Sequence, residues 1–108
     1  MEKSWRSGRI VEAPSMSTIA DGIGVRIPVP EAVEDMRNTV DDVLLVDDAR
    51  IVAAMRLICA HAGLIIEPAG AAGVAALMAH REKFAGQRVA TVLCGGNVTG
   101  AQIKDWLS

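Results

Sequence analysis

The sequence predicts an α/β protein in which a parallel sheet layer is flanked by helices. Two apolar runs, Asp42–Val46 and Arg88–Leu93, have the Val and Leu content of strands that are buried on both faces. Between and after them, apolar residues recur every three or four positions, as they do on one face of a helix. Strands that alternate with helices form parallel sheets, and 108 residues are enough for one small domain.

The first 29 residues have the composition of an irregular segment. Proline and glycine recur there too often for a long element, although Arg9–Glu12 is compatible with a short strand. We expect residues 1–17 to be loosely ordered, and we treat 1–108 as a single segment.

Two helices are predicted in the middle of the chain. Glu31–Val40 has the helical spacing and carries acidic residues in its first turn, where the helix dipole favours them. The next helix begins after Asp47, a good N-cap residue, and ends at Gly63. Its predicted inward stripe consists of Ile51, Met55, Ile58 and Ala62.

Two further helices are predicted toward the C-terminus. Pro68 suits the first turn of a helix that runs to about His80. Asn97 or Thr99 can cap a last helix, Ala101–Leu107, whose inward residues are Ile103 and Leu107.

Charge and composition exclude several classes of protein. The formal net charge is −2 and there is no basic patch, which argues against binding to nucleic acid or to an anionic membrane. The longest apolar run, Ala69–Ala79, is too short to span a bilayer, and the N-terminus has no secretory signal. Cys59 and Cys94 make no disulfide framework. We expect a soluble cytoplasmic protein.

The most informative motif is Cys94-Gly95-Gly96-Asn97, which follows the second predicted strand. Ligands bind at the carboxyl ends of parallel strands, and a glycine pair lets the backbone approach a bound molecule closely. This tetrapeptide is weak evidence alone. It follows two other motifs in the chain, Thr-Ile-Ala-Asp-Gly at Thr18–Gly22 and Glu-Pro-Ala-Gly-Ala-Ala-Gly at Glu67–Gly73.

In this order and spacing, the three motifs resemble the C-terminal part of threonine/serine dehydratases, with short threonine ammonia-lyases and serine racemases as the nearest look-alikes. These are lyases of amino-acid metabolism in the fold type II, or tryptophan synthase β-like, group of pyridoxal-phosphate enzymes. The resemblance covers Ser4 to Trp106. It implies part of a fold type II domain, pyridoxal 5'-phosphate as cofactor, and β-elimination of threonine or serine to a 2-oxo acid and ammonia. It also implies a homo-oligomer or pairing with a missing N-terminal half.

The resemblance assigns roles to the cofactor-binding candidates. Cys94 would face the pyridine nitrogen, where a neutral thiol leaves the ring a weaker electron sink than an acid would; the alternative is an inert structural cysteine. A catalytic thiol needs a partnered histidine, and neither histidine is tied to Cys94. Gly95, Gly96 and Asn97 would shape the wall around the ring.

Two further positions are assigned to the same cleft. Glu67 would lie on the ring's side of it, the alternative being an acid at a helix start. Asp21 and Gly22 look like the family's pocket-lining turn. No metal ligands are assigned, because the acidic metal site of the racemase-like members precedes this segment.

The chain lacks what the chemistry requires most. The family's cofactor-bonding lysine and its glycine-rich phosphate loop precede the first motif, and Lys3, Lys83 and Lys104 match no family motif. We therefore expect a fragment without catalytic residues that does not catalyse alone. The alternative is a non-catalytic partner or truncated remnant that dimerises with a full-length homologue. The sequence does not distinguish between a truncated gene, a split enzyme and a regulatory partner. It also leaves open whether the substrate is threonine or serine, and whether the reaction is elimination or racemisation.

Overall fold

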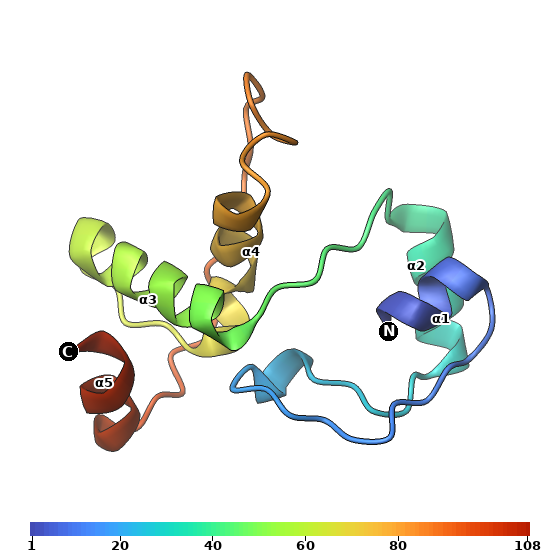
Figure 1. Ribbon diagram of the computed structural model, residues 1–108, viewed down its shortest axis with the longest axis horizontal. Coiled ribbons are helices and arrows are strands. Elements are labelled where there is room, and N and C mark those ends of the chain that lie inside the picture. Colours follow the sequence, from blue (N-terminus) through green and yellow to red (C-terminus); the bar gives the residue numbers. More distant parts are fainter. The chain divides into compact units, whose positions relative to one another are not determined.

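The computed structural model describes residues 1–108 and is built from helices joined by irregular segments (Figure 1). The chain divides into two compact units, one of Met1–Ser17 with Ile23–Leu45 and the other of Thr18–Gly22 with Val46–Ser108. None of the helices has both the length and the apolar character needed to cross a membrane. The elements in chain order are α1 (Glu2–Ser7), the 3-10 turn η1 (Asp21–Ile23), α2 (Pro30–Thr39), α3 (Asp48–Ala62), α4 (Pro68–Ala79) and α5 (Gly100–Leu107).

In the first unit, α1 packs against α2. The Trp5 indole N–H donates to the Met36 carbonyl at 3.3 Å, and Val33 of α2 is buried. Ser4 is fully buried, and its hydroxyl both donates to the Val11 carbonyl and accepts from the Val11 N–H. The sequence pattern did not predict α1. It is only six residues long and has no side-chain N-cap, so contacts with other segments stabilise it rather than local signals.

In the second unit, α3 and α4 pack together and carry most of the core (Figure 1). Helix α5 packs on α3, and its Trp106 and Leu107 contact the core from outside. Small side chains dominate the α4 side, so the two helices can approach closely. The buried core residues of this unit are Ala20, Ile51, Ala54, Met55, Ile58, Ile66, Ala71 and Ala75.

The helix boundaries confirm most of the capping predictions. The Asp47 carboxylate accepts the Arg50 N–H at 2.8 Å, and Gly63 ends α3 with a φ of 66°. Pro68 opens α4, and Thr99 rather than Asn97 caps α5. The predicted inward stripe of α3 is correct except at Ala62, which is exposed because the helix ends there.

The predicted parallel sheet is not present in this chain. Asp42–Val46, Arg88–Leu93 and Arg9–Glu12 are not strands, and no backbone ladder joins any of them to another segment. The burial expected of the first two is also wrong, since Leu45 is 70% and Val92 is 78% exposed. A strand satisfies its N–H and C=O groups only on a neighbouring strand, and no segment of these 108 residues provides one.

Candidate functional site

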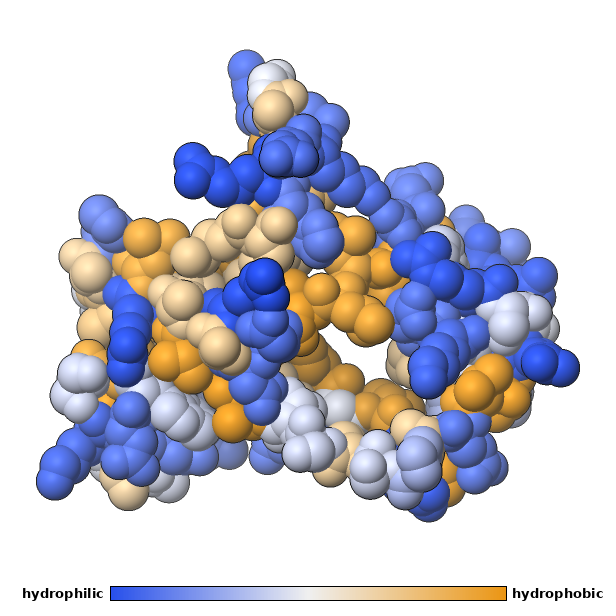
Figure 2. Space-filling view, in the orientation of Figure 1, coloured by the Kyte–Doolittle hydropathy of each residue, from blue (hydrophilic) through white to orange (hydrophobic).

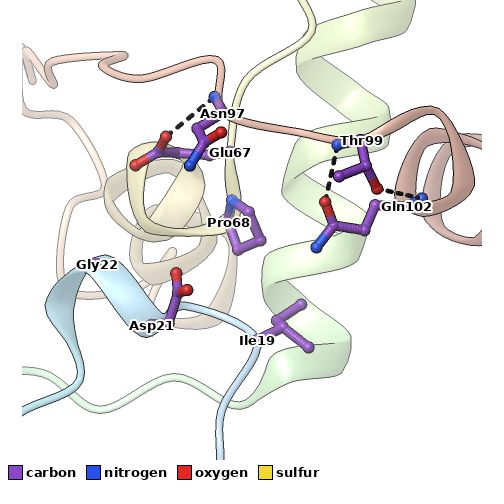
Figure 3. A pocket seen from close by; sticks show the side chains of 8 residues that line it. All are labelled: Ile19, Asp21, Gly22, Glu67, Pro68, Asn97, Thr99 and Gln102. Carbon is purple, nitrogen blue, oxygen red and sulfur yellow. Dashed lines mark hydrogen bonds between the residues drawn. The ribbon is translucent and has the colours of Figure 1, made fainter.

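The second unit contains an open pocket of about 410 Å³ that gathers residues from distant parts of the sequence (Figure 3). It lies where the turn of the first motif, the start of α4, the loop after Cys94 and the start of α5 meet. Its lining residues are Ile19, Asp21, Gly22, Glu67, Pro68, Asn97, Thr99 and Gln102.

The Thr18–Gly22 turn is held in place by the first turn of α3. The Thr18 hydroxyl donates to one Asp48 carboxylate oxygen at 2.6 Å, and the Ile19 N–H donates to the other at 3.2 Å. The Thr18 hydroxyl also accepts the Ala20 N–H, and Ala20 is buried. Asp48 therefore orients the turn that presents Asp21 and Gly22 to the pocket.

The Cys94–Asn97 loop is attached to the start of α4 through Glu67. The Glu67 N–H donates to the Gly95 carbonyl at 3.1 Å. The Glu67 carboxylate accepts the Asn97 N–H at 3.2 Å, as Figure 3 shows. Gly95 has a φ of 80°, and a Cβ at that position would overlap the Glu67 carboxylate. Glycine is therefore required at position 95 by both backbone conformation and space.

The glycines of α4 allow the helix backbone to meet the chain that leads into this loop. A Cβ on Gly70 would overlap the Cys94 carbonyl oxygen, and a Cβ on Gly73 would overlap the Thr91 hydroxyl. The small residues of α4 therefore form a packing surface. The contact fixes the path of residues 91–94 beside α4 without any ladder hydrogen bond.

The pocket lining is acidic and polar. Asp21 and Glu67 contribute carboxylates, while no lysine, arginine or histidine lines the pocket. The Thr99 N–H donates to the Gln102 side-chain oxygen and the Gln102 N–H donates to the Thr99 hydroxyl, so these two side chains are engaged in a capping box (Figure 3). The site therefore suits neutral or cationic groups and repels anions.

The structure brings together four of the seven residues predicted for the site. Asp21, Gly22, Glu67 and Asn97 line the pocket. Cys94, Gly95 and Gly96 do not line it, and Cys94 is exposed.

Several residues of the site were not predicted, although two had a recognisable signal. Thr99 and Gln102 form a Thr-x-x-Gln capping box, a pattern that marks a helix start. Ile19 belongs to the first motif and Pro68 to the second. Nothing in the local pattern indicated that Asp48 would bind the Thr18 turn.

The sequence model of the family described as "Pyridoxal-phosphate dependent enzyme" matches residues 1–95, so the chain belongs to this family, whose cofactor is pyridoxal phosphate. Relatives include L-threo-3-hydroxyaspartate ammonia-lyase from Pseudomonas sp, 36% identical over 90% of this chain and 30% of the relative. L-threonine ammonia-lyase from Geobacter sulfurreducens is 36% identical over 88% of this chain and 24% of the relative. Serine racemase from Schizosaccharomyces pombe is 30% identical over 99% of this chain and 33% of the relative.

Solved structures place the chain within fold type II pyridoxal-phosphate enzymes. The threonine deaminase of T.th. matches with a TM-score of 0.84 and 29% identity, over 91% of this chain and 33% of that one. Maize serine racemase matches with a TM-score of 0.82 and 31% identity, over 96% of this chain and 34% of the maize chain. The chain thus spans about 30% of the length of its relatives and corresponds to part of their domain.

The residues present fit one side of pyridoxal phosphate and not the other. The Cys94–Asn97 segment carries no charge and is exposed, and Gly96 leaves its backbone open to a flat ring edge, because a Cβ there would meet only the Ile65 carbonyl oxygen at 3.6 Å. The phosphate does not fit the pocket, because Asp21 and Glu67 would repel a dianion and no cation lines the site. Residues outside this chain would have to hold the phosphate.

Proposed function

We propose that this chain is the C-terminal portion of a pyridoxal-phosphate-dependent ammonia-lyase for hydroxy amino acids, and that it supplies the pyridine side of the site. The complete enzyme would remove a proton from Cα and hydroxide from Cβ of threonine or serine. Water then hydrolyses the resulting C–N unsaturated product, so that a 2-oxo acid and ammonia are released. When bound, pyridoxal phosphate supplies the electron withdrawal that makes the Cα proton acidic.

The observation that carries this proposal is the set of relatives. Hydroxyaspartate and threonine ammonia-lyases and serine racemases all match nearly the whole chain, and the substrates in their names all have a hydroxyl on Cβ. The first two names state that ammonia is released, so elimination is favoured over racemisation as the main reaction.

In this proposal the chain's residues position the ring and leave the proton transfer at Cα to a lysine elsewhere. Cys94 would face the pyridine nitrogen, and Gly95, Gly96 and Asn97 would form the adjoining wall. Lys3, Lys83 and Lys104 do not line the pocket, which supports a half-site. The cytosol is the proposed location, because both cysteines are free thiols.

Exposed apolar surface also favours a partial domain. Figure 2 shows hydrophobic atoms at the surface over α3 and α4. Large side chains that a complete domain would cover are exposed in the second unit, and monomeric proteins rarely leave so many uncovered. They are Leu57, Leu64, Ile65, Met78, Val89, Val92 and Leu93.

Reconstitution tests the proposal. The chain is mixed with pyridoxal phosphate and with the N-terminal part of the Geobacter sulfurreducens relative, from which the region matching this chain has been removed. We expect 2-oxo acid formation from threonine or serine by the mixture and none by either part alone. A well-folded complex that forms no 2-oxo acid would contradict the split-enzyme form of the proposal.

A direct check concerns the missing lysine. The chain alone is incubated with pyridoxal phosphate and then reduced with borohydride, and labelled peptides are identified by mass spectrometry. We expect no specific adduct. A stoichiometric adduct at one lysine would show that the chain carries its own cofactor-bonding residue.

The second candidate function is a non-catalytic partner of a full-length homologue. The same missing lysine and the same exposed apolar surface favour it. It predicts that the chain binds a full-length homologue at a fixed subunit ratio, measured by size-exclusion chromatography with light scattering. Failure to bind any full-length homologue would eliminate this role.

A further inference from the structure

Glu67 occupies an N-cap position but does not cap its helix. The side chain of an N-cap residue can accept a hydrogen bond from a free N–H in the first turn of the helix, as aspartate commonly does. Asp47 does so at the start of α3, where its carboxylate accepts the Arg50 N–H. The Glu67 side chain makes no such bond at the start of α4.

The Glu67 carboxylate is used on the Cys94–Asn97 loop instead. One oxygen accepts the Asn97 N–H at 3.2 Å, and the carboxylate lies against Gly95, where a Cβ would overlap it. The Glu67 main chain adds a bond from its own N–H to the Gly95 carbonyl. The loop is therefore attached to the start of α4 at Gly95 and at Asn97, on either side of Gly96.

The same carboxylate also approaches the Thr18–Gly22 turn. A Cβ on Gly22 would come within 3.5 Å of a Glu67 oxygen and within 3.3 Å of the Ala69 Cβ. Glu67 thus lies between the turn, whose Asp21 and Gly22 line the pocket, and the loop, whose Asn97 lines it, and Glu67 lines the pocket itself (Figure 3).

We propose that Glu67 is a positioning residue that fixes the conformation of the Cys94–Asn97 loop through the Asn97 N–H. Its carboxylate holds Asn97, the residue of the loop that lines the pocket. That this wall faces a cofactor ring rests on the proposed function, whereas the attachment of the loop does not.

The test compares Glu67→Ala with Glu67→Gln in the full chain, with amide hydrogen exchange followed by NMR. Loss of a charge-assisted bond should speed Asn97 exchange about tenfold in Glu67→Ala. Glu67→Gln keeps an acceptor oxygen and should stay within about threefold of the wild-type chain. The Ala71 N–H bonds to the main-chain carbonyl of residue 67, so its exchange should remain unchanged in both variants.

Asp47→Ala is the matched control, because Asp47 holds the corresponding position in α3. It should speed exchange at Arg50 and leave Asn97 unchanged. If Glu67→Ala instead speeds exchange through the first turn of α4 and not at Asn97, Glu67 is an ordinary cap and the proposal is wrong. The proposal is also wrong if Asn97 exchange in Glu67→Ala stays within about twofold of the wild-type rate. It is equally wrong if Asn97 exchanges as fast in Glu67→Gln as in Glu67→Ala.

A second measurement connects the loop to the cofactor. In the reconstituted complex, Glu67→Ala should raise the Kd for pyridoxal phosphate about tenfold and Glu67→Gln less than about threefold. If the complex binds no cofactor with the wild-type chain, the proposed function fails while the exchange result still decides the role of Glu67. An unchanged Kd in Glu67→Ala would show that the wall does not face the cofactor.

Discussion

The α3–α4 pair and the Arg88–Leu93 segment are similarly rich in apolar residues, but the first is buried and the second is exposed. Ile51, Ala54 and Met55 of α3 are at most 2% exposed, whereas Val92 is 78% exposed and Val89 is 42% exposed. Both regions were predicted to be buried. Hydrophobicity alone therefore does not determine which region forms the core of this chain.

The difference comes from where each region finds hydrogen-bond partners. A helix satisfies its N–H and C=O groups within itself, so α3 and α4 need only one face covered, and they cover each other. A long extended segment has to find partners for its N–H and C=O groups on other segments, which for a buried strand means a neighbouring strand on each side. Arg88–Leu93 has α4 beside it through Gly73 and Thr91, and no strand.

The largest expected effect is on the helical core. Met55→Ala removes a side chain that is 1% exposed, and the lost contacts and residual cavity should lower the free energy of unfolding by about 2–5 kcal/mol. Urea denaturation followed by far-UV circular dichroism measures it. The control is Leu57→Ala on the same helix, which is 40% exposed and should cost less than about 1 kcal/mol. Equal losses would mean that α3 does not bury the face described.

An intermediate effect is expected where the two regions touch. Gly70→Ala places a methyl group against the Cys94 carbonyl oxygen, so it should cost about 1–3 kcal/mol by the same measurement. This loss is expected even though alanine favours helices over glycine by about 1 kcal/mol. Gly100→Ala in α5 is the control, since nothing lies within 4 Å of its added Cβ, and it should be neutral or stabilising. Stabilisation by Gly70→Ala would show that residues 91–94 are not held against α4.

The smallest effect is expected within the unpaired segment. Val92→Ala should change the stability of the chain alone by less than about 0.5 kcal/mol, because the side chain is already in water. In the reconstituted complex, the same change should weaken association of the two parts about tenfold if Val92 becomes buried there. Titration of the labelled chain with its N-terminal counterpart measures the affinity. An unchanged affinity would show that this face stays open in the complete enzyme.

The same physical distinction separates the predictions that were confirmed from those that were wrong. Asp47, Gly63 and Pro68 were found at helix ends because capping depends on residues within a turn of each other. The strands at Asp42–Val46 and Arg88–Leu93 were wrong for this chain because pairing depends on a second segment. Helix α1 was missed for the converse reason, since a distant partner, Met36, contributes to its stability.

The residues predicted for the candidate site also divide into some that line the pocket and some that do not. The resemblance of three short motifs to a known family was enough to select Asp21, Gly22, Glu67 and Asn97, and all four line one pocket. Cys94 was predicted at the same wall and does not line it. Its neighbour Gly95 does not line the pocket either, and its carbonyl accepts the Glu67 N–H, a bond that the motif did not indicate.

The sequence by itself determined the limits of α3, the start of α4, the family and the positions of the pocket-lining motifs, because these depend on local spacing and residue type. Only the tertiary structure decided that the Glu67 carboxylate binds the Asn97 N–H rather than its own helix, and that Asp48 holds the Thr18 hydroxyl. Each of these bonds joins residues 30 positions apart, a separation that local spacing does not encode.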